Sequence, residues 1–324
     1  MTPPQKRTLR FGTDGRFKIL AITDLHFGPE ADPFAIELIA DMIAMEKPHL
    51  VIANGDNIMG GDSKTVAEVR DAVQQVSTAM EEAKTPWAVT LGNHDREHFE
   101  NTGLADADFF KLFERYPHNL NSHWETTITG TGNNFLLIWN ANGEKPAANI
   151  WLLDSGKGAA DKTLRYEWIH NDQISWYQRT SSALEKQHGR LPSLMFFHIP
   201  IREFLDLGAS KAFLGNRNED EAPSGINSGL FAAVLERKDV IGIFCGHDHT
   251  NNYIGQVRNI ALGFIGVTGV RNAYPFLQEN DPKNQQLRGG RVFELYADKP
   301  GQFKSWLRVR DGSAKWESWN GAPA

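Results

Sequence analysis

The chain has 324 residues, a formal net charge of -6 at pH 7, 40% hydrophobic and 23% charged residues, and a single cysteine, Cys245. This composition is that of an ordinary globular protein and excludes a disordered chain, a coiled coil or a collagen-like protein. A single cysteine excludes an intrachain disulfide and a cysteine-rich zinc cluster. No apolar run approaches the roughly 18 residues that a membrane helix needs, and the acidic charge argues against a general nucleic-acid binder.

Strand and helix patterns alternate in the first third of the chain. Short apolar runs rich in β-branched residues predict buried strands, and apolar stripes at helical spacing predict helices between them. Asp32 and Pro33 are typical of a helix start. In chain order we predict strand 17–23, helix 32–46, strand 49–54, helix 63–84 and strand 87–91. A β-α-β-α-β order indicates a largely parallel sheet covered by helices.

The rest of the chain predicts a second sheet. An Asn-Gly pair at 142–143 favours a hairpin turn, and the tail from Arg291 alternates like an antiparallel meander. The predicted elements are helix 105–116, strands 134–139 and 149–154, helix 172–188, strand 193–197, helix 229–238 and strand 240–245. We therefore expect an α/β fold, a four-layer α-β-β-α sandwich of two mixed β-sheets with the helices outside.

The domain organisation is expected to be simple. The sequence shows no internal repeat, linker or low-complexity run, so we predict one domain over residues 1–324, with a C-terminal β-meander at about 255–310. The first eleven residues, MTPPQKRTLRF, contain no apolar stretch of the kind found in a signal peptide. This predicts a cytoplasmic protein, or a periplasmic or secreted one if a leader was removed. The sequence indicates no oligomeric state.

Five polar clusters stand out because each directly follows a predicted strand. They are Asp24-Leu25-His26, Gly55-Asp56-Asn57, Gly92-Asn93-His94-Asp95, His198 with Pro200, and Gly246-His247-Asp248-His249. Open α/β sheets place ligands at the carboxyl ends of their strands, so all five clusters can converge on one edge.

The residue types in these clusters fit a metal site. Asp, Asn and His supply the oxygen and imidazole ligands that suit zinc, manganese or iron. Asp24 and His26 are two residues apart, as are His247 and His249, and side chains two apart in an extended segment point to the same side. A carboxylate such as Asp56 can bridge two cations, and paired metals are suited to phosphoryl displacement.

The ordered set of clusters over residues 24–249 resembles the calcineurin-like metallophosphoesterase superfamily, whose pattern is D-x-H, G-D, G-N-H-[DE], a lone H and G-H-x-H. The segments NSGLF and CGHDHTN, with LLDS and the Trp- and Tyr-containing segment after it, resemble the branch of Dcr2-type and purple-acid-phosphatase-like phosphatases. The resemblance implies a metallophosphoesterase-like fold and a centre of two divalent or trivalent metal ions.

The resemblance also implies a role for each matching residue. The first metal would be held by Asp24, His26 and His249, and the second by Asn93, His198 and His247. Asp56 would be the bridging carboxylate. His94 would contact the phosphate and protonate the leaving group, with Asp95 orienting it through the other ring nitrogen.

One departure from the purple enzymes affects the choice of metal. Those enzymes have D-x-G in the first block and a tyrosine three residues after the bridging aspartate, where this chain has His26 and Met59. The iron-tyrosinate chromophore is therefore expected to be absent. A colourless manganese, zinc or mixed iron centre is expected in its place.

These residues predict a phosphoesterase that hydrolyses phosphate monoesters by attack of a metal-bridging hydroxide, acting on a phosphorylated small molecule or phosphopeptide. The main alternative is a phosphodiesterase, of the cyclic nucleotide or phospholipid head-group type, with the same metal centre. A nuclease is disfavoured by the net charge of -6. A non-catalytic scaffold is disfavoured because all seven expected ligand positions and His94 are present. The loops that would separate monoester from diester specificity, at 99–125, 155–175 and 203–226, carry no clear pattern.

Overall fold

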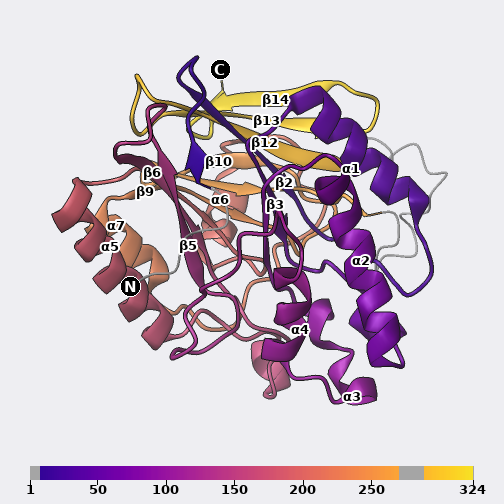
Figure 1. The fold of residues 1–324 in the computed structure, drawn as a ribbon. Coiled ribbons are helices and arrows are strands. Elements are labelled where there is room, and N and C mark those ends of the chain that lie inside the picture. Colours follow the sequence, from indigo (N-terminus) through magenta and orange to yellow (C-terminus); the bar gives the residue numbers. More distant parts are fainter. Residues whose placement is uncertain (1–7, 270–287, 324) are drawn as a thin grey trace.

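Two β-sheets lie face to face between two layers of helices, as the sequence predicts (Figure 1). The computed structural model describes residues 8–269 and 288–323. Helices α1 and α2 cover one outer face, and α5 and α7 cover the opposite one. Among the described residues, no helix combines the length and the apolar character that crossing a membrane requires.

The first sheet contains the predicted N-terminal parallel strands. Its order within the described residues is β15-β14-β13-β12-β2-β3-β4, with β2, β3 and β4 parallel and the C-terminal strands antiparallel. The strands are β2 (Arg16–Ile22), β3 (Leu50–Asn54), β4 (Trp87–Thr90), β12 (Gly289–Tyr296), β13 (Phe303–Val309), β14 (Ala314–Trp319) and β15 (Ala322–Pro323).

The second sheet is built from the middle of the chain. Its order within the described residues is β1-β5-β6-β7-β9-β11-β10-β8, with β6, β7, β9 and β11 parallel. The predicted hairpin is formed by β5 and β6. The strands are β1 (Leu9–Arg10), β5 (Asn134–Trp139), β6 (Pro146–Leu152), β7 (Ser193–Phe196), β8 (Phe213–Leu214), β9 (Val240–Cys245), β10 (Ile254–Val257) and β11 (Ile260–Phe264).

Among the residues that the structure describes, three apolar cores hold the layers together. The central core lies between the sheets, where Phe17 and Ile19 of β2 meet Phe196 of β7 and Phe244 of β9. The outer cores lie under the helices on each side. The helices are α1 (Pro33–Glu46), α2 (Val66–Glu82), α3 (Phe99–Thr102), α4 (Asp106–Glu114), α5 (Asn171–His188), α6 (Glu203–Ser210) and α7 (Leu230–Arg237).

The C-terminal meander is shorter than predicted. Strands β12 to β15 form a meander in the first sheet, but β10 and β11 form a hairpin that extends the second sheet beside β9. The segment 270–287 between them lies outside the described residues. Alternating apolar residues suit either sheet, so the sequence pattern does not show which neighbour a strand pairs with. The short helix α6 was also not anticipated.

Candidate metal centre

The five polar clusters converge at the carboxyl ends of strands from both sheets. The segments that follow β2, β3 and β4 come from the first sheet, and those that follow β7 and β9 come from the second. Backbone hydrogen bonds join the segments directly: the Asp24 N–H donates to the Gly55 carbonyl at 3.1 Å, and the Gly246 N–H donates to the His198 carbonyl at 3.1 Å. The predicted convergence on one edge is confirmed for these segments.

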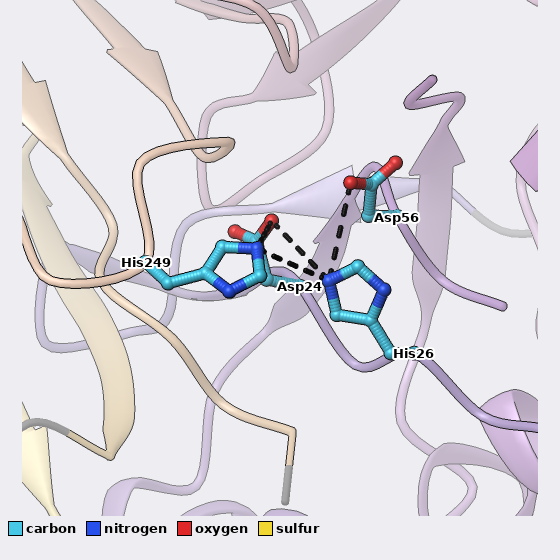
Figure 2. A group of neighbouring side chains, drawn as sticks. All are labelled: Asp24, His26, Asp56 and His249. Carbon is cyan, nitrogen blue, oxygen red and sulfur yellow. Dashed lines mark hydrogen bonds and ion pairs between the residues drawn. The ribbon is translucent and has the colours of Figure 1, made fainter. Parts of the chain in front are cut away.

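One group of donor atoms comprises Asp24, His26, Asp56 and His249, all buried (Figure 2). The Nε2 atoms of His26 and His249 are 3.2 Å apart. The Oδ1 atom of Asp24 lies 3.2 Å from His249 Nε2. The Oδ2 atom of Asp56 lies 3.9 Å from His26 Nε2. Figure 2 shows these side chains pointing toward a common point, which is the arrangement of a cation site.

A second group shares Asp56 with the first and adds His198 and His247. His198 Nε2 lies 3.1 Å from Asp56 Oδ2. The rings of His198 and His247 meet edge to face, with centroids 5.3 Å apart. Since one carboxylate belongs to both groups, two cations could be held side by side with Asp56 between them.

Among the described residues, the buried Oδ1 atom of Asn93 has no hydrogen-bond partner, and Asp56 Oδ2 and His198 Nε2 have none besides each other. Such under-satisfied atoms are the sign expected where a cation belongs. A buried polar atom without a partner costs free energy unless another group satisfies it. Imidazole nitrogen, carboxylate and amide oxygen form the donor set that zinc, manganese and iron accept. The residues therefore fit a pair of metal ions.

The tautomer of His198 is set by the backbone. Its Nδ1 lies 3.0 Å from the carbonyl oxygen of Asn54, so the proton on Nδ1 is donated there and Nε2 faces Asp56. An imidazole oriented in this way by a carbonyl group is typical of metal ligands.

Two glycines allow the clusters to approach one another. A Cβ atom on Gly92 would lie 2.2 Å from Asp56 Oδ1, and one on Gly246 would lie 2.1 Å from Thr23 Oγ1. Both distances are shorter than any allowed contact, so these positions require glycine. The close approach of the clusters thus depends on two residues that carry no side-chain donor atom.

The charges of the buried groups favour ligand binding at most positions. Burial lowers the pKa of His26 to about 3, with the charge of His249 adding to it. Burial likewise lowers the pKa of His247 to about 3, with His198 adding to it. Burial acts to raise the pKa of Asp56, but the charge and hydrogen bond of His198, together with the charges of His94 and His26, outweigh it and hold that pKa well below its usual range. Neutral imidazoles and an ionised carboxylate are the forms that bind metals.

His198 differs from the other two histidines. Burial acts to lower its pKa, but the charges of Asp56 and Asp24 outweigh this and raise the pKa to about 10. A proton on Nε2 then occupies the direction toward Asp56 that a cation would take. Metal binding here would displace that proton.

His94 lies at the open side of the centre. Its ring meets that of His26 edge to face, with centroids 5.2 Å apart, and its side chain is 25% exposed. Its backbone N–H donates to Asp56 Oδ1 at 2.8 Å. Burial acts to lower the pKa of His94, but the hydrogen bond that its Nδ1 donates to Glu97 and the charge of Asp56 raise it to about 9.

The predicted pairing of Asp95 with His94 is wrong. Both oxygens of Asp95 are used elsewhere: they accept from the N–H groups of Ile58 and Gly92 at 2.9 and 2.8 Å and from Asn57 Nδ2 at 3.0 Å. The carboxylate beside His94 Nδ1 is that of Glu97 and not that of Asp95, with Glu97 Oε1 at 2.9 Å. Asp95 therefore ties the loops after β3 and β4 together. Because Glu97 is three residues after His94, a helical turn in that loop would have indicated the pair.

Sequence reasoning also missed Tyr166, whose ring lies edge to face on His247 with centroids 4.4 Å apart. It belongs to the segment that precedes the predicted helix 172–188, where the sequence predicts no helix or strand. Its only sequence signal was its place in the Trp- and Tyr-containing stretch after LLDS.

A sandwich of two mixed sheets with two Asp/His groups sharing one carboxylate defines a protein of the phosphoesterase class that can hold two metal ions. The model of the calcineurin-like phosphoesterase family matches residues 17–251. The chain belongs to this family.

The relatives agree with the branch predicted from the sequence. The chain is 32% identical to "Probable inactive purple acid phosphatase 14" of Arabidopsis thaliana, over 82% of this chain and 73% of that protein. It is 28% identical to "Phosphatase DCR2" of Saccharomyces cerevisiae, over 74% of this chain and 45% of that protein. The fold is similar to that of a dimetal phosphatase from Danio rerio, with a TM-score of 0.62, 13% identity, and 94% and 98% of the two chains covered.

Proposed function

We propose that this protein hydrolyses phosphate monoesters with two metal ions, manganese, zinc or iron, acting on a phosphorylated small molecule or phosphopeptide. The observation that carries the proposal is the sharing of Asp56 by two buried donor groups, together with the Oδ1 atom of Asn93, which has no hydrogen-bond partner among the described residues. Membership of the calcineurin-like phosphoesterase family supports the reaction class.

The proposed ligands divide between the two groups. Asp24, His26 and His249 would hold one ion, and Asn93, His198 and His247 the other, with Asp56 common to both. Two bound ions lower the pKa of water and neutralise charge on phosphoryl oxygens. The backbone N–H of His94 fixes Asp56 through Oδ1, which leaves Oδ2 directed at His198.

His94 is the proposed proton donor to the leaving group. It is the site histidine with the most exposed side chain, so an ester oxygen can reach its Nε2 from solvent. Glu97 lies against the other ring nitrogen and holds the ring in place. General acid catalysis of this kind contributes about 10²–10⁴-fold to a rate.

The test compares hydrolysis of p-nitrophenyl phosphate and bis-p-nitrophenyl phosphate by the same preparation. The protein is stripped of metal and then given manganese, zinc, iron, nickel or magnesium in turn. Faster hydrolysis of the monoester is expected. Preference for the diester would replace the proposal with a phosphodiesterase, and a lack of turnover with every metal would leave a non-catalytic scaffold. The relatives whose names contain the word "inactive" make that last arm of the test necessary.

A further inference from the structure

A strained turn lies beside the metal centre. Arg165 has φ of 63° and ψ of -64°, and the N–H of Tyr166 donates to the carbonyl of Leu164 at 2.8 Å. A three-residue turn with positive φ at its central residue is rare and strained, and a residue with a side chain adopts it at a cost in free energy. Such strain persists only where the surrounding structure enforces it.

Hydrogen bonds from two other segments enforce this turn. On one side, the Ala159 N–H donates to the Arg165 carbonyl at 3.0 Å. On the other side, the Gly225 N–H donates to the Leu164 carbonyl at 2.9 Å, and Ser224 Oγ donates to the Tyr166 carbonyl at 2.8 Å. The backbone on both sides of Arg165 is thereby fixed, and with it the direction of the Tyr166 side chain.

The turn directs Tyr166 at the metal centre. Its ring packs edge to face on His247, with centroids 4.4 Å apart, and the side chain is half-buried. The Arg165 guanidinium carbon lies 5.8 Å from the centroid of the same ring. A positively charged side chain is thus placed next to the phenol at the edge of the metal centre.

The hydroxyl of Tyr166 is available as a donor. A phenolic O–H is a hydrogen-bond donor and keeps its proton at neutral pH, because the ordinary pKa of tyrosine is about 10.

We propose that Tyr166 is a substrate-binding residue whose hydroxyl donates a hydrogen bond to a phosphoryl oxygen at the His247 side of the centre, with Arg165 adding positive charge. The inference rests on the proposed function for the identity of the ligand, a phosphoryl group. It assigns a role to the segment 155–175, which the metal ligands leave without one. The strained turn at Arg165 fixes the position of the Tyr166 side chain before substrate binds.

The experiment uses Tyr166→Phe, which keeps the ring on His247 and removes only the hydroxyl. Tyr116→Phe is the matched control, because Tyr116 is also half-buried but packs against Trp87 in the core under α2 and α4. All proteins are loaded with manganese and freed of excess metal. Binding of inorganic phosphate is measured by titration calorimetry, with metal content and Tm as controls for folding, and kcat/KM for p-nitrophenyl phosphate is measured in parallel.

We expect phosphate to bind about 10-fold more weakly to Tyr166→Phe than to the wild type, as for loss of one hydrogen bond to a charged acceptor, with kcat/KM reduced alongside. Metal content and Tm should be unchanged, and Tyr116→Phe should match the wild type. Equal phosphate affinity in Tyr166→Phe and the wild type, or no phosphate binding by the wild type, would overturn the inference. So would loss of metal in Tyr166→Phe, because that would show a structural role.

The two proposals fail in different ways. If the wild type hydrolyses neither ester but Tyr166→Phe still binds phosphate more weakly, the proposed function fails and the binding role of Tyr166 stands. If the wild type hydrolyses the monoester and Tyr166→Phe matches it in both measurements, the proposed function stands and the binding role fails.

Discussion

The Nε2 atoms of His26 and His249 face each other at 3.2 Å, although the two residues are 223 positions apart in the chain. Asp24 Oδ1 lies 3.2 Å from the same nitrogen of His249. A gap this short between two ring nitrogens has room for one proton at most. A cation bound to both nitrogens and to Asp24 would satisfy all three donors at once.

Metal removal is therefore expected to destabilise the protein. A metal ion present at about 100 times its Kd contributes about 2.7 kcal/mol to the folded chain, so Tm should fall by roughly 3–5 °C on treatment with a chelator and recover on addition of manganese. Differential scanning calorimetry with and without the chelator measures this. In Asp24→Asn the difference should shrink. An identical Tm for stripped and loaded wild type would contradict a metal site here.

Asp56→Asn tests the bridge between the two donor groups. The substitution preserves shape but removes the negative charge that both groups share, so the bound metal should fall below two ions per chain and turnover should drop by about 10²–10³-fold or more. Metal content is measured by elemental analysis alongside steady-state hydrolysis. The exposed Asp62→Asn serves as the matched control. Rates like those of the wild type in Asp56→Asn would rule out a two-metal mechanism.

His94→Ala separates proton donation from phosphate positioning. An alkyl leaving group needs protonation more than p-nitrophenolate does, so kcat for an alkyl phosphate should fall about 10²-fold and that for the aryl phosphate much less. Glu97→Gln alters the group beside Nδ1 of His94, so it should also reduce kcat more for the alkyl phosphate than for the aryl phosphate, but by a smaller factor. Equal losses on both substrates would assign His94 to positioning alone.

Glu46, which lies outside the metal centre, is expected to make the stability of the protein fall at acid pH. Its carboxylate accepts from Trp306 Nε1 at 2.9 Å, from Arg308 Nε at 2.6 Å and from Lys18 Nζ at 3.1 Å. Burial acts to raise the pKa of Glu46, but these three donors outweigh it and lower the pKa. The stabilisation is therefore present above the pKa of the unfolded chain and is lost as the pH falls through the lower pKa of the folded one.

Glu46→Gln should lower the free energy of unfolding by about 1–3 kcal/mol at pH 7. The difference from the wild type should begin to narrow as the pH falls below the ordinary glutamate pKa of about 4.3 and should be lost as it falls through the lower pKa of the folded protein. Urea denaturation of both proteins across this range measures it. A difference that stays constant down to pH 3 would show that the ion pairs do not contribute in the way proposed.

The strand-end residues were predictable because each depends on a local pattern. An apolar run followed by Gly-Asp, Gly-Asn-His or Gly-His-x-His places a metal-binding side chain at the end of a strand, and this can be recognised without knowledge of the tertiary contacts. Asp24 and Asp56 could therefore be assigned to the site directly from the sequence. The layer architecture follows from the same alternation of strands and helices.

The contacts that depend on tertiary packing were not predictable. Asp95 is adjacent to His94 in sequence, yet it faces the backbone of Ile58, because the short helix that begins at His94 turns the two side chains apart. Tyr166 reaches His247 only because residues 224 and 225 hold its backbone from the other side. Strands β10 and β11 have the alternation of a meander but pair beside β9.

The donor atoms are divided between the two sheets, since Asp24, Asp56 and Asn93 follow strands of the first and His198, His247 and His249 follow strands of the second. Neither half of the chain can assemble the centre alone, because its completion requires contacts between residues more than 100 positions apart, which form slowly in folding. Metal ions bound at this centre would therefore link the two sheets, and they could bind only after the sheets have packed together. The rate at which a refolding chain captures manganese would report when the sheets dock.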